Sequence, residues 1–117
     1  MSLILFHNPR CSKSRETLAL LEQHHIHPKI ELYLQNTYTP TELQHLADKL
    51  GISDVRQMMR TKDELYGELG LDNPSLSQEA LLQAISQHSS LLERPILING
   101  NKAKIGRPPE SVLAILD

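Results

Sequence analysis

The fold of this chain is decided by residues 2–34, which read SLILFHNPRCSKSRETLALLEQHHIHPKIELYL. The apolar run Ser2–Phe6 predicts a buried strand, and the Asn8-Pro9 turn ends it. A helix is predicted over Ser12–His24, because leucines recur there at helical spacing. Lys29–Leu34 alternates partly between polar and apolar residues and predicts a second strand. A strand, a helix and a strand in succession favour parallel pairing through a right-handed crossover.

The middle of the chain is predicted to be a helical insertion. Thr39-Pro40-Thr41-Glu42 has the pattern of a capping box with Pro at the first helical position, and Gly51 ends the helix that begins there. Residues 54–88 are predicted to be wholly helical, with short helices over Asp54–Met59 and Lys62–Leu69. No strand is needed in this part of the chain.

The C-terminal part predicts a hairpin and a last helix. Ile96–Ile98 and Lys102–Ile105 read as two strands, and Asn99-Gly100 is a strong signal for the turn between them. Gly106-Arg107-Pro108-Pro109 opens the last helix. We therefore predict an α/β fold, a mixed β-sheet with flanking helices and a helical insertion, in one domain over residues 1–117.

Composition excludes several classes of function. The chain has 117 residues, a net charge of -2, and three Tyr and one Phe as its only aromatic residues. These values do not favour a nucleic-acid partner, which calls for a broad cationic surface and stacking side chains. No stretch is long and apolar enough to predict a signal peptide or a membrane span. With a single Cys no internal disulfide can form, so we expect a cytoplasmic protein.

The single cysteine, Cys11, lies at the predicted junction of the first strand and the first helix. Unpaired backbone N–H groups and the helix dipole favour an anion at that place, so the position favours a thiolate and an oxyanion beside it. The spacing Cys11-x-x-Ser14 resembles a dithiol redox motif whose second thiol is replaced, and such a site needs an external thiol. The hydroxyls of Ser12 and Ser14 could hydrogen-bond the sulfur. Positive charge could be added by His7, Arg10, Lys13 and Arg15.

Cys11 and the histidines that follow the first predicted helix also admit other interpretations. A lone Cys is most often a small buried hydrophobic residue, but Cys11 lies among Pro, Arg, Ser and Lys instead of inside an apolar run. A tyrosine-phosphatase loop needs Arg six positions after the Cys, where this chain has Thr17. The histidines at 24, 25 and 27 follow a helix and complement its dipole, so no metal site is predicted there.

Three separated stretches carry a resemblance to a known family. They are HNPRCSKSRETL at 7–18, MRTKDELYGELGL at 59–71 and LLERPILINGNKAKIGRPPESVLAIL at 91–116. In this order they resemble the motifs of the glutaredoxin-coupled arsenate reductases and their close relatives. The resemblance implies a thioredoxin-like fold with a helical insertion and a cis peptide bond between Arg94 and Pro95.

The resemblance also implies roles for named residues. Cys11 would be the nucleophile that attacks arsenate, and Arg60, Arg94 and Arg107 would hold the oxyanion, which suits the planar two-pronged guanidinium. Glutathione would be the co-substrate and glutaredoxin the partner that resolves the mixed disulfide, with no tightly bound cofactor and no metal. The loop that stabilises the thiolate would comprise His7, Asn8, Ser14 and Arg15.

Two alternative functions stay open beside the arsenate reductase. One is a monothiol oxidoreductase of the same fold that acts on another thiol or oxyanion. The other is a non-catalytic redox regulator, whose relatives tend to carry a Cys-x-x-Cys switch; Ser14 stands where this chain would need the second Cys. For every alternative we expect a monomer that binds neither nucleic acid nor membranes.

Overall fold

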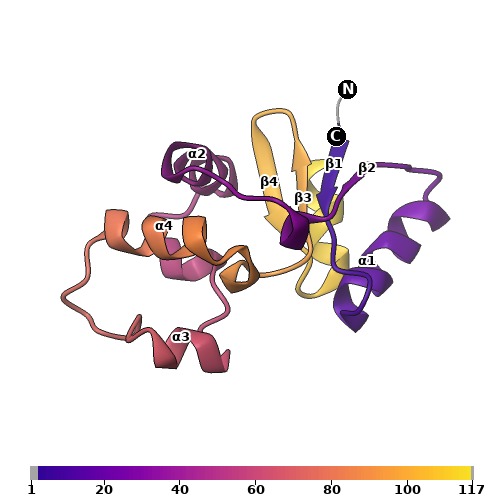
Figure 1. Cartoon of the computed structure of the whole chain (residues 1–117). Coiled ribbons are helices and arrows are strands. Elements are labelled where there is room, and N and C mark those ends of the chain that lie inside the picture. Colours follow the sequence, from indigo (N-terminus) through magenta and orange to yellow (C-terminus); the bar gives the residue numbers. More distant parts are fainter. Residues whose placement is uncertain (1–2, 117) are drawn as a thin grey trace. The chain divides into compact units, whose positions relative to one another are not determined.

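The computed structural model describes residues 3–116, and the contacts between residues divide them into two compact units (Figure 1). The first unit consists of residues 3–35 and 94–116, and the second of Asn36–Glu93. Ser2, the first residue of the predicted strand, lies outside the described residues. The organisation as one domain over residues 1–117 stays a prediction.

The first unit is built on a four-stranded mixed sheet in the order β2-β1-β3-β4. Strand β1 pairs in parallel with β2 and antiparallel with β3, which pairs antiparallel with β4. The predicted strand, helix and strand unit and the predicted hairpin are therefore confirmed. The strands are β1 (Leu3–Phe6), β2 (Lys29–Glu31), β3 (Ile96–Asn99) and β4 (Lys102–Ile105).

One apolar core joins this sheet to two helices. Leu5 of β1 lies opposite Leu97 of β3, and both are fully buried. They pack with Leu21 of α1 (Ser12–Gln23) and with Val112 of the 3₁₀ helix Pro109–Ile115, which lies against α1 (Figure 1). Burying one such side chain contributes about 1.5–3 kcal/mol, so this cluster holds α1 and its N-terminus against the sheet.

Strand β2 is shorter than the predicted strand Lys29–Leu34. Its last residue, Glu31, pairs with Phe6, the last residue of β1. The chain of β1 then turns at Asn8-Pro9, so no neighbouring strand is left to pair with the next residues. Tyr33–Gln35 form a 3₁₀ helix instead.

The hairpin turn differs from the prediction, and the predicted last helix is a 3₁₀ helix over Pro109–Ile115. Asn99 still pairs with Lys102, so the two-residue turn is Gly100-Asn101 and not Asn99-Gly100. Gly100 has a φ of +61°, and a Gly with positive φ at the first turn position is typical of a type II′ turn. The Asn99 side chain donates instead to the carbonyl of Ile115 at 2.6 Å.

The second unit is helical, as predicted for the insertion. The predicted capping box is present, since the Thr39 hydroxyl accepts from the Glu42 N–H at 3.1 Å and the Glu42 carboxylate from the Thr39 N–H at 2.9 Å. The prediction that residues 54–88 are wholly helical is wrong in part, because Met59 is extended and forms an antiparallel bridge with Leu92. The α-helices are α2 (Pro40–Leu50), α3 (Glu64–Glu68) and α4 (Gln78–Gln87), with 3₁₀ helices at Val55–Met58 and Ser89–Leu91.

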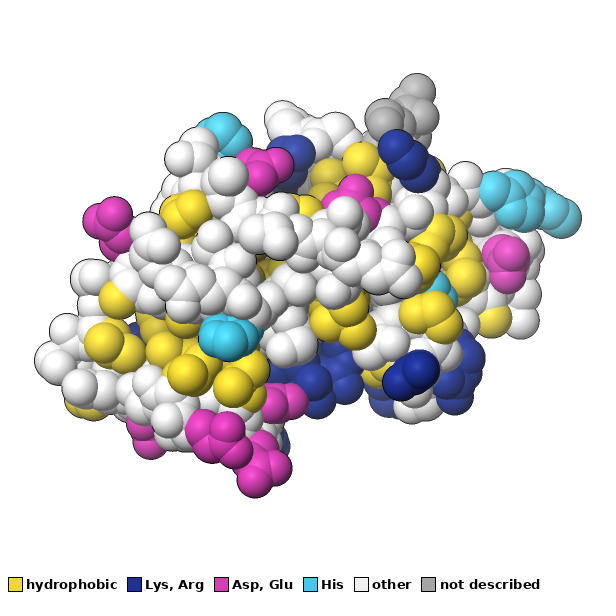
Figure 2. Space-filling model, viewed as in Figure 1, with side chains coloured by type: hydrophobic (Ala, Val, Ile, Leu, Met, Phe, Trp, Pro, Cys, Tyr) yellow, Lys and Arg dark blue, Asp and Glu magenta, His cyan; other side chains and the backbone are white. Residues whose placement is uncertain are grey.

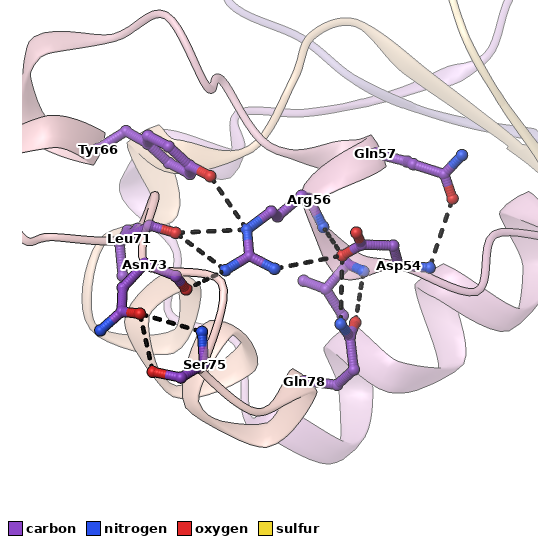
Figure 3. A network of polar contacts seen from close by, with 9 residues as sticks. Asp54, Arg56, Gln57, Tyr66, Leu71, Asn73, Ser75 and Gln78 are labelled. Atoms are coloured by element: carbon purple, nitrogen blue, oxygen red, sulfur yellow. Dashed lines mark hydrogen bonds and ion pairs between the residues drawn. The ribbon is translucent and has the colours of Figure 1, made fainter.

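A polar network centred on Arg56 fixes the segment that follows α3 (Figure 3). Its guanidinium donates to the Tyr66 hydroxyl at 3.1 Å and to the carbonyls of Leu71 and Asn73 at 3.2 and 2.8 Å. It also lies 3.9 Å from the carboxylate of Asp54. Because one planar group satisfies acceptors from three places, α3 and the turn after Gly70 are tied to the 3₁₀ helix Val55–Met58.

Candidate active site

Cys11 is the N-cap residue of α1, at the junction where the sequence placed it. Its backbone is extended, with φ of -94° and ψ of 125°, and its carbonyl accepts the N–H of Arg15 at 3.0 Å. The thiol makes no capping hydrogen bond and is 8% exposed. The sulfur is therefore nearly buried at a helix end whose backbone N–H groups and dipole favour negative charge.

The loop before Cys11 is held in shape by its own hydrogen bonds. The carbonyl of Asn8 accepts the N–H of Cys11 at 3.0 Å, and the Asn8 side-chain oxygen accepts the N–H of Arg10 at 3.0 Å. The Arg15 guanidinium, one turn into α1, donates to the carbonyl of Pro9 at 2.9 Å. Asn8 and Arg15 thus fix the chain on the approach to the thiol.

Ser14 ties the end of β1 to the first turn of α1. Its hydroxyl shares a hydrogen bond of 2.7 Å with Nδ1 of His7 and accepts the N–H of Asn8 at 3.0 Å. Ser14 is fully buried and His7 is 6% exposed. The sequence suggested that this hydroxyl would hydrogen-bond the sulfur, whereas the structure gives it His7 and Asn8 as partners.

His7 does not supply the positive charge that the sequence suggested. Its burial, and then the positive charge of Arg15, lower the pKa of His7 below the ordinary 6.5, so the ring is neutral at neutral pH. A neutral ring can accept at one nitrogen, which suits the bond with Ser14. The sequence suggested a cation at this position, but His7 directly follows the buried end of β1 and is itself buried.

The lowered pKa of His7 predicts that acid destabilises the fold. Between the folded pKa and the unfolded value of about 6.5 the unfolded chain binds more protons, so the free energy of unfolding falls as pH drops through this range and is constant above it. His7→Asn keeps an acceptor near the position of Nδ1 but cannot titrate. Urea unfolding at pH 7.5 and 5.5 should therefore show a smaller loss of stability in His7→Asn than in the wild type. Equal losses in the two proteins would contradict the assignment.

Arg107 lies against the thiol although it is distant in sequence. Its Nη2 lies 3.7 Å from the Cys11 sulfur, and its Nε donates to the carbonyl of Arg94 at 2.9 Å. Both Arg94-Pro95 and Arg107-Pro108 are cis peptide bonds, and the first of these was expected from the resemblance. The structure thus brings Cys11, Arg107 and the backbone of Arg94 together.

Arg60 lies in the second unit, where it pairs with Asp63. Its Nη1 is 2.8 Å from the Asp63 carboxylate, and its N–H donates to the carbonyl of Leu91 at 2.8 Å. Asp63 is also the N-cap of α3, since its carboxylate accepts the N–H of Leu65 at 2.9 Å. Asp63 was not predicted as part of the site from the sequence. An Asp just before a helix and three residues after an Arg is nevertheless a recognisable signal for a helix cap and an ion pair.

A tight contact behind the site was also not predicted from the sequence. Gly106 precedes Arg107, and a Cβ at that position would lie 2.7 Å from Thr17 Oγ1 and 2.8 Å from Pro95 Cγ. Thr17 is fully buried on α1, and its hydroxyl donates to the carbonyl of Lys13 at 2.8 Å. The absence of a side chain at Gly106 therefore lets the segment that carries Arg107 approach α1 and the cis proline.

Gly106→Ala is expected to lower both stability and the reactivity of the thiol. The added methyl group overpacks a closed site, which costs about 1–3 kcal/mol, and it displaces Arg107 from the sulfur. Urea unfolding measures the first effect, and the rate of Cys11 alkylation by iodoacetamide at neutral pH measures the second. Gly67→Ala is the matched control, since a Cβ there meets nothing within 4 Å and should leave both values nearly unchanged or raise stability. Equal behaviour of the two variants would contradict the packing argument.

No helix among residues 3–116 has both the length and the apolar character needed to cross a membrane. The same residues bring together no group of three or more His, Cys, Asp or Glu side chains that could hold a metal ion.

The chain is similar to known proteins in sequence and to solved structures in fold. Residues 6–115 match the model of the ArsC family. The chain is 71% identical over 116 residues to the arsenate reductase of Haemophilus influenzae, an alignment that covers 99% of this chain and 100% of that protein. It is 49% identical over 112 residues to the uncharacterized protein YfgD of Escherichia coli, with 96% and 94% covered. A solved structure of an arsenate reductase from Vibrio cholerae matches with a TM-score of 0.95 at 51% identity, with 99% and 98% covered. The predicted thioredoxin-like fold, with its mixed sheet and flanking helices, is confirmed.

Proposed function

Because the chain belongs to the ArsC family, we propose that it is an arsenate reductase that works through a thiol-arsenate adduct on Cys11. The observation that carries the proposal is the guanidinium of Arg107, 3.7 Å from the single thiol of the chain. That thiol stands at the N-terminus of α1, where a tetrahedral anion would meet both the helix dipole and a guanidinium.

The first step is a condensation on arsenic. The Cys11 thiolate attacks the As(V) atom of arsenate, a sulfur-arsenic bond forms, and one arsenate oxygen leaves as water after protonation. Negative charge on the arsenate oxygens grows in the transition state, and fixed donors lower the barrier most when they are aimed at such charge. We assign this task to Arg107 because of its contact with the Cys11 sulfur, and to Arg94 and Arg60 on the resemblance alone. His7, Asn8, Ser14 and Arg15 keep the loop in the shape that presents the thiolate.

The second step transfers two electrons to arsenic. The thiolate of glutathione attacks the Cys11 sulfur, the sulfur-arsenic bond breaks, and its electron pair stays on arsenic. Arsenite, As(III), leaves, and Cys11 is left in a mixed disulfide with glutathione. Because the chain has one Cys, the thiol that resolves this disulfide comes from outside, and we propose glutaredoxin. The proposal requires no tightly bound cofactor, and a monomer in the reducing cytoplasm would suit it.

A coupled assay tests the proposal. The protein is mixed with glutathione, glutaredoxin, glutathione reductase and NADPH, and NADPH consumption is followed with and without arsenate. Consumption that depends on arsenate, on the protein and on glutaredoxin supports the full proposal. Consumption that depends on arsenate and the protein but persists without glutaredoxin would support the arsenate reductase activity and reject glutaredoxin as the partner. No consumption, with Cys11 still alkylated by iodoacetamide, would move the function to a different thiol or oxyanion substrate.

A further inference from the structure

A pocket of about 290 Å³ lies beside the loop that precedes Cys11. All of its lining belongs to the first unit. Pro9 and Arg10 come from the loop between β1 and α1, and Leu32, Leu34 and Gln35 follow the edge strand β2. Because Arg10 is the neighbour of Cys11 in the chain, anything bound in this pocket lies next to the loop that carries the thiol.

Strand β2 and the segment that follows it expose large apolar side chains. Among residues 3–116 three large hydrophobic side chains are exposed: Ile30 at 39%, Leu34 at 46% and Leu69 at 42%. Ile30 belongs to β2, and Leu34, four residues further along the same segment, lines the pocket. Figure 2 shows hydrophobic side chains exposed beside β2. Strand β2 is also an edge strand, and no described strand pairs with its outer side. Clustered apolar exposure at an open sheet edge is typical of a protein contact.

The same surface carries positive charge on a chain whose net charge is -2. Residues 8–15 hold Arg10, Lys13 and Arg15 and no acidic residue, and all three basic side chains are exposed. Lys13 lies 3.6 Å from Glu16, so this pair adds no net charge, and the positive charge of the rim comes from Arg10 and Arg15. Figure 2 shows Lys and Arg side chains gathered over the beginning of α1. A basic rim of this kind steers an acidic partner toward the thiol.

We propose that the pocket of Pro9, Arg10, Leu32, Leu34 and Gln35, with its basic rim, is the docking site of the thiol protein that reduces the Cys11-glutathione disulfide. The inference rests on the proposed function, and it names a partner with an acidic surface around its reactive thiol and an apolar side chain that enters the pocket. A small anion alone would use the basic rim but not Ile30, Leu34 or the open edge of β2. A protein partner would contact the basic rim and also Ile30, Leu34 and the open edge of β2.

The chemistry at this surface is a disulfide exchange. The partner thiolate attacks the glutathione sulfur of the mixed disulfide, the bond between the two sulfurs breaks, and Cys11 leaves as a thiolate. The partner then carries the glutathione disulfide, so the oxidised sulfur pair has moved and no other oxidant or reductant takes part. Arg107, 3.7 Å from the Cys11 sulfur, lies where it stabilises the departing thiolate.

The test uses the mixed disulfide itself and needs no arsenate. The Cys11-glutathione form is made with oxidised glutathione, and its reduction is timed with glutaredoxin and, separately, with dithiothreitol. In Leu34→Glu we expect the glutaredoxin rate constant to fall about tenfold while the dithiothreitol rate constant changes less than about twofold. Arg10→Gln should lower the ratio of the two rate constants and weaken its dependence on salt. Leu69→Glu, a similarly exposed leucine in the second unit, is the matched control and should leave the ratio unchanged.

The outcomes separate the docking site from the proposed function. A ratio that falls in Leu34→Glu and Arg10→Gln but not in Leu69→Glu supports the docking site, whatever the arsenate assay gives. Equal ratios in all four proteins, or an equal fall in Leu69→Glu, would overturn it. If the ratio responds as expected but arsenate drives no NADPH consumption, the docking site stands and the arsenate reductase does not.

Discussion

Replacing Cys11 by Ser is expected to abolish arsenate-dependent turnover and, at the same time, to stabilise the protein slightly. The serine hydroxyl stays protonated at neutral pH and cannot form the sulfur-arsenic adduct, so kcat should fall by a factor of about 10³ or more. Cys11 is the N-cap of α1 and its side chain makes no capping hydrogen bond. Serine is among the best N-cap residues, and its hydroxyl contributes roughly 0.5–1 kcal/mol at such a position.

The coupled assay and urea unfolding measure these two effects. Cys11→Ala is the control, because it removes the thiol without supplying a capping group; it should be as inactive as Cys11→Ser but no more stable than the wild type. Turnover of Cys11→Ser near the wild-type level would show that Cys11 is not the nucleophile. A loss of activity that is accompanied by a loss of stability would instead indicate that the cysteine mainly fills space in the fold.

Local sequence patterns predicted most of the helices and strands but fewer of the details that tertiary contacts set. The strand, helix and strand unit follows from periodicity and one turn, and the capping box at Thr39 from four adjacent residues. The end of β2 depends instead on where its partner β1 ends. The turn at Gly100-Asn101 depends on how far β3 extends, and Asn99 remains in β3, where it also pairs with Leu3 of β1. Such limits are set by residues far away along the chain.

Some contacts of the candidate site could likewise be predicted from the sequence and others could not. Asn8, Ser14 and Arg15 lie close to Cys11 in the sequence, and their grouping around the loop could be predicted from that alone. The contact between Cys11 and Arg107 joins residues 96 positions apart, and only the resemblance indicated it. The neutral His7 was missed because charge in a sequence says nothing about burial.

Arg107→Gln is expected to cause the second-largest loss of activity. The variant keeps a side chain of similar reach but loses the charge that faces the Cys11 sulfur at 3.7 Å and the donor to the Arg94 carbonyl at 2.9 Å. Removing one fixed donor from developing charge typically lowers the rate by about 10²–10³, so we expect kcat/KM for arsenate to fall by that factor. Stability should change little, because the Arg107 side chain is exposed.

A second measurement on Arg107→Gln separates its two tasks. If the guanidinium stabilises the thiolate as well as the oxyanion, alkylation of Cys11 by iodoacetamide at neutral pH should slow together with turnover. Iodoacetamide is uncharged and needs no oxyanion site, so unchanged alkylation with lost turnover would restrict Arg107 to arsenate. Lys104→Gln removes an exposed positive charge from β4, three residues before Arg107, and should leave both rates within about twofold of the wild type. If it lowers them as much as Arg107→Gln does, the effect belongs to the general charge of this surface, and the specific contact with the sulfur cannot be its cause.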